Sequence, residues 1–172
     1  QPVSSQIWSP INIGKVNSRG LELRSTLKIS ITNKLYSKAG LNFDYTKSKD
    51  NGQDIRFADS NGNVLNYEIE RWEENGSSYI WVKVPQIDQN SNSSYIYVYY
   101  GNSSASDSQN ITGVWKDDYK GVWHFKEVVH NSCTGNVNDT CDSTINSING
   151  SWTGTFLSAN GKIGKAGQFT NN

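Results

Sequence analysis

Two glutamates, Glu68 and Glu70, have the spacing best suited to acid–base chemistry. They stand two positions apart in a predicted strand and therefore share one face of it. Two carboxyl groups about 5–9 Å apart can hydrolyse a glycosidic bond if burial raises the pKa of one of them. No apolar neighbour in the sequence ensures that burial. We therefore interpret the pair as part of a solvated strand face next to Arg56 and Arg71.

A histidine, His124, is the other candidate for catalysis. It lies between Trp123 and Phe125 in an aromatic stretch, where a structural role is the simpler interpretation. A serine hydrolase would need a nucleophile elbow of the form G-x-S-x-G, and the sequence has none. We expect the chain not to be an enzyme.

Oxygen-bearing side chains alternate at Asp59, Asn61 and Asn63, as they do at the start of a calcium-binding loop. The glycine of an EF-hand comes later than Gly62, and no glutamate follows at the twelfth position, so a hairpin turn is the preferred interpretation. Looser clusters occur around Asp117–Asp118 and around residues 138–142. We expect no metal site and no cofactor, with calcium left open as the one alternative.

The two cysteines, Cys133 and Cys141, are separated by a polar, turn-rich segment. We predict that they form a disulfide, which is typical of an oxidising compartment. The alternatives are two free thiols or half of a zinc site completed by His124 and His130, although that spacing matches no standard zinc finger.

Glycosylation sequons of the form N-x-S/T occur six times in the chain. Each falls in a predicted loop or at its edge, where an attached glycan would have to lie. The six asparagines are Asn75, Asn92, Asn102, Asn110, Asn138 and Asn149.

Six tryptophans could stack on sugar rings or fill a core. We expect four or more of them to be buried. Trp8 and Trp152 lie in polar surroundings and are therefore the predicted exposed, sugar-stacking pair.

The charges balance, with 16 basic and 16 acidic residues among 172. That balance removes the argument for a nucleic-acid partner or an anionic membrane surface, which needs a basic excess. No apolar run reaches the roughly 18 residues that span a bilayer, so we expect no membrane contact by this segment. Polarity comes instead from 21 asparagines and 23 serines.

The elements that must position these residues are predicted strands. Apolar and polar residues alternate over 21–32, residues 79–84 are strongly β-prone, and the aromatic and β-branched residues 95–100 are predicted as another strand. Two hairpins are predicted, one over 54–71 with its turn at 59–62 and one turning at 74–76, while 35–40 is assigned to a turn or short helix. The fold class is therefore all-β, an antiparallel β-sandwich of jelly-roll or immunoglobulin-like type with little or no helix.

Composition divides the chain into four predicted parts. Residues 1–10 form a polar arm and residues 11–105 the β-sandwich domain. Residues 106–118 are a linker rich in small polar residues, and 119–172 carry further strands, which either begin a second domain or complete the first sandwich.

Three strings resemble an uncharacterised β-domain family of large prokaryotic surface and secreted proteins. They are DIRFADSNGNVLNYEIERW (54–72), IWVKVPQI (80–87) and YIYVYYGNSSASDSQN (95–110). In that family a concanavalin A-like (laminin-G-like) lectin domain often follows. GVWHF (121–125) and GKIGKAGQF (161–169) resemble its opening.

The resemblance implies an extracellular or cell-surface location, and it leaves two non-enzymatic functions open. The first is a structural or adhesive module, such as a filament subunit, joined to other copies or other surface proteins by strand exchange through an arm carrying Val3, Ile7 and Trp8. The second is a carbohydrate-binding module of a larger secreted enzyme or adhesin, with glycans as partners.

Overall fold

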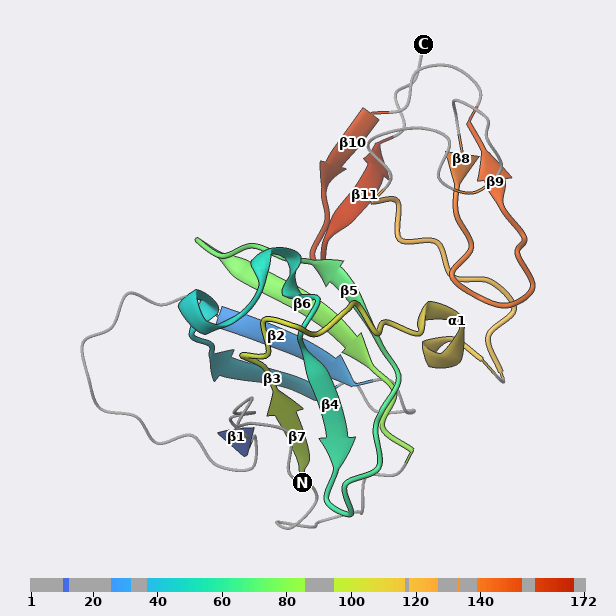
Figure 1. Ribbon diagram of the computed structural model, residues 1–172. Coiled ribbons are helices and arrows are strands. Elements are labelled where there is room, and N and C mark those ends of the chain that lie inside the picture. Colours follow the sequence, from blue (N-terminus) through green and yellow to red (C-terminus); the bar gives the residue numbers. More distant parts are fainter. Residues whose placement is uncertain are drawn as a thin grey trace. The chain divides into compact units, whose positions relative to one another are not determined.

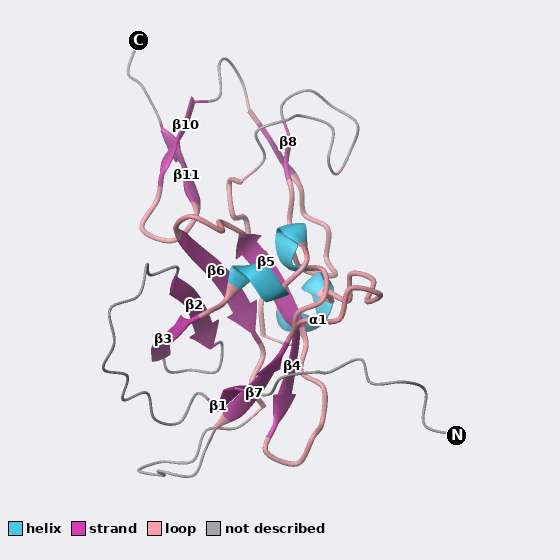
Figure 2. Cartoon of the chain, turned by 60° about the vertical axis from the view of Figure 1, so that its left-hand side comes forward, coloured by secondary structure: helices cyan, strands magenta, loops and turns pink. Residues whose placement is uncertain are grey.

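The computed structural model divides the chain into two compact units, residues 1–110 and 111–172 (Figure 1). The structure describes residues 11–12, 26–31, 37–85, 95–116, 118–126, 133, 139–152 and 157–168. The division falls within the segment predicted as a linker. Strands predominate and the helices are short, which confirms the all-β class (Figure 2).

The described residues of the first unit form two sheets. The three-stranded sheet has the order β1-β7-β4 and contains β1 (Ile11–Asn12), β4 (Arg56–Asp59) and β7 (Ile96–Tyr99). The four-stranded sheet has the order β3-β2-β6-β5 and contains β2 (Thr26–Ile31), β3 (Ser37–Asn42), β5 (Tyr67–Arg71) and β6 (Ser77–Val82). Short 3₁₀ turns, η1 (Tyr45–Lys47) and η2 (Asp50–Gly52), lie between β3 and β4.

Side chains from both sheets form one hydrophobic core between them. Successive side chains of a strand point to opposite faces of its sheet. Ile80 and Val82 of β6 therefore point into the core, as do Ile96 and Val98 of β7, while the residues between them are half-buried. The cluster consists of Phe43, Tyr45, Ile55, Phe57, Leu65, Tyr67, Ile80, Val82, Val84, Ile96, Val98 and Tyr100.

Three local expectations about strands need correction. Residues 37–42 form strand β3, paired along its length with β2, and not a turn or helix. The first predicted hairpin is wrong because β4 and β5 belong to different sheets, and only an isolated bridge, Ala58 with Val64, pairs across its turn. The sheets are also not wholly antiparallel, since β2 runs parallel to β6. The second hairpin, β5–β6, is confirmed.

In the second unit, the described residues form one short helix and two small antiparallel sheets. The helix α1 spans Ile111–Val114. One sheet pairs β8 (Asp139–Thr140) with β9 (Gly150–Ser151), and the other pairs β10 (Leu157–Asn160) with β11 (Lys165–Gln168). Among the described residues, no helix combines the length and apolar character needed to cross a membrane.

Candidate functional site

The buried carboxylate of Asp54 connects two of the family-like strings. Asp54 begins the string 54–72, and it binds the amide of Gly101 in the string 95–110. Asp54 is fully buried, and each of its oxygens accepts one backbone amide, from Lys49 at 2.9 Å and from Gly101 at 2.7 Å. Gly101 has a φ of 95°, a left-handed conformation that glycine adopts without strain. The acidic residue before β4 therefore fixes the end of β7.

Two cations hold the segment that follows β7. The Arg56 guanidinium donates to the carbonyls of Gln53, Ile55 and Ser106 at 2.9, 2.6 and 2.6 Å. The Lys49 ammonium donates to the Ala105 carbonyl at 2.9 Å. These side chains act as structural clamps on carbonyl groups, so the motif residues Asp54 and Arg56 build the frame around β7.

Strand β7 has two neighbours that cover it unequally (Figure 1). On one side β4 pairs with all four of its residues, from Ile96 to Tyr99. On the other side β1 pairs with two of them, with Ile11 opposite Val98 and Asn12 opposite Tyr97. The edge of β7 is thus closed by a two-residue strand from near the start of the chain.

The outward face of the same stretch carries three tyrosines, which the sequence analysis did not single out. Tyr95, Tyr97 and Tyr99 are half-buried, while the alternating residues Ile96 and Val98 are buried. The ring centroids of Tyr95 and Tyr97 lie 5.2 Å apart, and those of Tyr97 and Tyr99 lie 6.1 Å apart. The signal was present as the strict alternation Y-x-Y-x-Y over 95–99. We call these three residues the tyrosine ladder.

The carboxylate pair is not the solvated face that the sequence suggested. Glu68 is 1% exposed and Glu70 is 7% exposed. Glu68 lies opposite Trp81 on β6, and the Trp81 indole N–H donates to Glu70 Oε2 at 3.1 Å. Strand pairing therefore supplies the apolar neighbour that could not be identified from the local sequence.

The alternating oxygens at 59–63 form a turn. Asp59 Oδ1 accepts the amides of Asn61 and Asn63, both at 2.9 Å, and Oδ2 accepts the Asn63 side-chain amide at 2.8 Å. The Asn63 side chain and then its backbone amide lower the pKa of Asp59. Both oxygens thus serve local donors.

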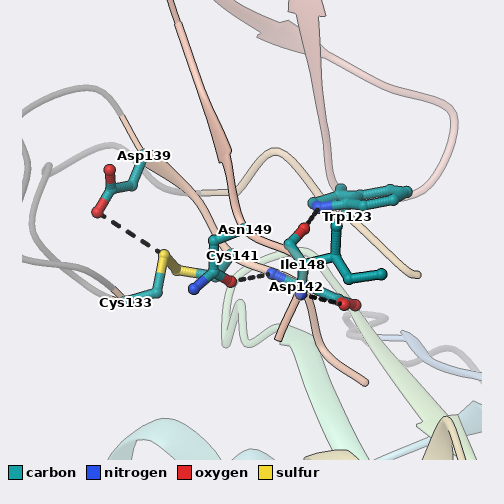
Figure 3. Close-up of a disulfide and its surroundings, with 7 residues drawn as sticks. All are labelled: Trp123, Cys133, Asp139, Cys141, Asp142, Ile148 and Asn149. Atoms are coloured by element: carbon teal, nitrogen blue, oxygen red, sulfur yellow. Dashed lines mark hydrogen bonds between the residues drawn. A yellow bond between two sulfur atoms is a disulfide. The ribbon is translucent and has the colours of Figure 1, made fainter. Parts of the chain in front are cut away.

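Asp142 organises the second unit in a similar way. Its carboxylate accepts the amides of Val122, Thr144 and Ile148, each at 2.9 Å, and its own amide donates to Asn149 Oδ1 (Figure 3). Burial acts to raise the pKa of Asp142, but these amide donors outweigh it and the net shift is downward. The aspartate is a structural centre for residues 122–149.

Cys133 and Cys141 form a disulfide beside this centre (Figure 3). Asp139 Oδ2 lies 3.9 Å from Cys133 Sγ. That approach is a contact only, because a disulfide sulfur carries no hydrogen to donate. The bridge links Cys133 to the residue that directly follows β8.

The four described sequons differ in their surroundings. Asn75 is exposed in the β5–β6 turn. Asn110 is also exposed, and its side-chain amide donates to Asn66 at 3.1 Å. The side-chain oxygens of Asn102 and Asn149 accept backbone amides. Asn92 and Asn138 lie outside the described residues.

The tryptophans are less buried than expected. Among the five that the structure describes, Trp115 alone is buried, at 4% exposure, and Trp123 is the most exposed, at 39%. Trp152 is half-buried, with its ring edge-on to Phe125 at 5.7 Å. Trp8 and the other arm residues, Val3 and Ile7, lie outside the described part of the chain.

Comparison with known proteins gives one match. A family model described as Domain of unknown function (DUF2341) matches residues 51–152. It covers the Asp54–Gly101 frame, β7 and the disulfide, and it runs beyond the three strings at 54–110 that carried the resemblance. Neither a curated protein nor a solved structure matches the chain.

Proposed function

Because this chain belongs to the DUF2341 family, which carries no assigned function, we propose a role from its strand arrangement. The chain is a structural or adhesive module outside the cell, and neighbouring copies join by exchanging the N-terminal strand. One observation carries this proposal: the short strand β1 closes the edge of β7 through the pairs Ile11–Val98 and Asn12–Tyr97.

Strand exchange needs an edge that accepts main-chain hydrogen bonds and a donor strand that can leave its own sheet. A sheet edge pairs with any strand of suitable register, because the bonds are made by the backbone. The same register can therefore be supplied by β1 of a neighbouring copy. Exchange in a head-to-tail direction builds a filament, since each copy both donates and accepts. Val3, Ile7 and Trp8 are the arm residues proposed to extend the donor.

An extracellular location is part of the proposal. The disulfide between Cys133 and Cys141 suits an oxidising compartment. The exposed Asn75 offers a place for a glycan in a host that makes N-linked glycans. The partners are other copies of the chain or other surface proteins.

Carbohydrate binding, as part of a larger secreted enzyme or adhesin, is the second candidate. It is favoured by partly exposed aromatic side chains, namely Trp123 and the tyrosine ladder. The lectin-like opening at 121–125 belongs to this second proposal.

Paired cysteines test whether β1 comes from the same chain or from a neighbour. Opposed residues in an antiparallel pair have Cα atoms about 4.5–5.5 Å apart, which a disulfide can bridge. We expect the Asn12→Cys/Tyr97→Cys double variant to give a ladder of covalent oligomers on a non-reducing gel. Each single variant, as the control, should give dimers at most. If the double variant yields only internally crosslinked monomers, β1 stays in its own chain and strand exchange is wrong.

A deletion variant provides a second test of strand exchange. Removing residues 1–10 is expected to abolish assembly, because the donor strand is shortened to its last two residues. Light scattering after gel filtration reports the mass directly. Polymers formed by the truncated chain, or an intact chain that is strictly monomeric, would contradict the proposal.

A further inference from the structure

The tyrosine ladder lies on the outward face of the three-stranded sheet, on its middle strand. The inward side chains of this strand, Ile96 and Val98, belong to the core, so Tyr95, Tyr97 and Tyr99 are held on a rigid support. The Tyr97 hydroxyl donates to the Tyr95 hydroxyl at 3.3 Å. Partly exposed aromatic rings on a regular strand form a fixed surface that loses little conformational entropy when a ligand binds.

Two residues of β4 lie beside the ladder. Ala58 is small, and the positive charge of Arg56 is already hydrogen-bonded within the protein. Ala58 is paired with Tyr97 and is 5% exposed, so β4 places a small, uncharged side chain beside that ring. Arg56 is paired with Tyr99, but its guanidinium donates to three backbone carbonyls. Neither neighbour offers an unoccupied charge, so the ladder favours an uncharged ligand.

The shape of the ladder distinguishes between ligand classes. It is one strand wide and contains no aliphatic side chain, whereas a protein partner needs a broad patch of about 800 Å² with an apolar centre. Phenol rings instead suit sugars, because the ring packs against C–H groups while the hydroxyl bonds to sugar hydroxyls. The planes of Tyr95 and Tyr97 differ by 81°, and those of Tyr97 and Tyr99 by 50°. Rings turned in this way do not form a flat platform for a crystalline polymer.

We propose that Tyr95, Tyr97 and Tyr99 form a binding strip for a single, soluble chain of a neutral polysaccharide. Successive rings contact successive sugars of a chain that turns along its axis. The strip makes the second candidate function specific, and it does not depend on strand exchange.

Calorimetry on the full chain tests the strip with defined probes. The neutral soluble probes are galactomannan, xyloglucan, mixed-linkage β-glucan and soluble starch. Polygalacturonate serves as the anionic probe, and insoluble cellulose in a pull-down serves as the crystalline one. We expect binding to at least one neutral soluble probe, and little or none to the other two classes. Binding to none of the neutral probes, or only to the anionic or crystalline probe, would overturn the proposal.

Substitutions locate the binding on the ladder. Tyr97→Ala should weaken binding about tenfold or more, because the central aromatic contact is lost. Tyr97→Phe, which keeps the ring, should weaken it much less. The matched control is Tyr119→Ala, which removes a 41% exposed tyrosine from the second unit and should leave affinity unchanged. Tyr95→Ala, at the start of the strand, provides a second test if Tyr97→Ala is unstable. Affinity that survives both alanine variants would show that the ladder is not the site.

Self-association is measured in the same samples without any polysaccharide. If Tyr95→Ala forms filaments normally but no longer binds polysaccharide, then the strip is not needed for strand exchange. Binding that persists in a strictly monomeric protein would leave the strip standing and remove strand exchange alone.

Discussion

Replacing Asp54 by asparagine tests whether the buried carboxylate fixes β7. Each carboxylate oxygen accepts one amide, from Lys49 and from Gly101, so the asparagine NH₂ must face one of these donors. One charge-assisted hydrogen bond is lost and buried donors are left unpaired. A hydrogen bond to a charged group contributes about 1.5–3 kcal/mol, and an unsatisfied buried group adds a penalty. We therefore expect the free energy of unfolding to fall by about 3 kcal/mol.

Two measurements report that loss. In urea, with a slope of about 1.5 kcal/mol per molar, the unfolding midpoint of the first unit should fall by about 2 M. Hydrogen-exchange mass spectrometry reads the Gly101 amide directly, and its exchange should speed up about 100-fold. Asp50→Asn, an exposed aspartate in η2, is the matched control and should change stability by less than about 0.5 kcal/mol. If Asp54→Asn stays within that same limit, the carboxylate does not hold β7.

Two further predictions concern the core and the disulfide. Burial raises the pKa of Tyr67 to about 12, so its neutral form is favoured in the folded state. The stability this provides is present below pH 10 and lost as the pH rises towards 12. Urea midpoints should therefore fall more steeply over this range in the wild type than in Tyr67→Phe, and parallel curves would contradict the assignment. Cys133 and Cys141 are separated by 8 in sequence, and replacing both with serine should cost the second unit about 2.5 kcal/mol by loop-closure entropy. Exchange of the 139–152 amides should speed up while that of β6 stays unchanged, and equal effects on both would count against this prediction.

Local sequence patterns predicted the strands whose own residues are β-prone. β6 and β7 are rich in aromatic and β-branched residues, which favour strands whatever their partners, and the turn at Asn75–Gly76 leads into a real hairpin. β3 has the sequence SKAGLN, which lacks such a pattern, and it is a strand because β2 pairs with every one of its residues. The Asn61–Gly62 turn was predicted, but turn chemistry does not determine which sheet the chain joins afterwards.

In the candidate site, too, local sequence predicted some features, while others depend on residues that are distant in sequence. The cysteine spacing was enough to suggest a disulfide, because the two residues lie close in sequence. Glu68 and Glu70 have Trp81 as a neighbour only through the β5–β6 register, which pairs it with Glu68 and brings its indole N–H to Glu70. Trp152 was expected to be exposed and is half-buried, while Trp123 is more exposed, since the polarity of neighbours in sequence does not report neighbours in space.

The parallel pairing of β2 with β6 has a consequence for how this chain is made. Thr26 pairs with Ser77, so the ribosome must add 51 more residues after β2 before its partner exists. At about 5–20 residues per second, that interval lasts roughly 3–10 s. During it β2 has β3 alone as a partner, and an isolated two-stranded hairpin is only marginally stable in water. The parallel pairing that completes the four-stranded sheet can therefore form only after β6 has been synthesised.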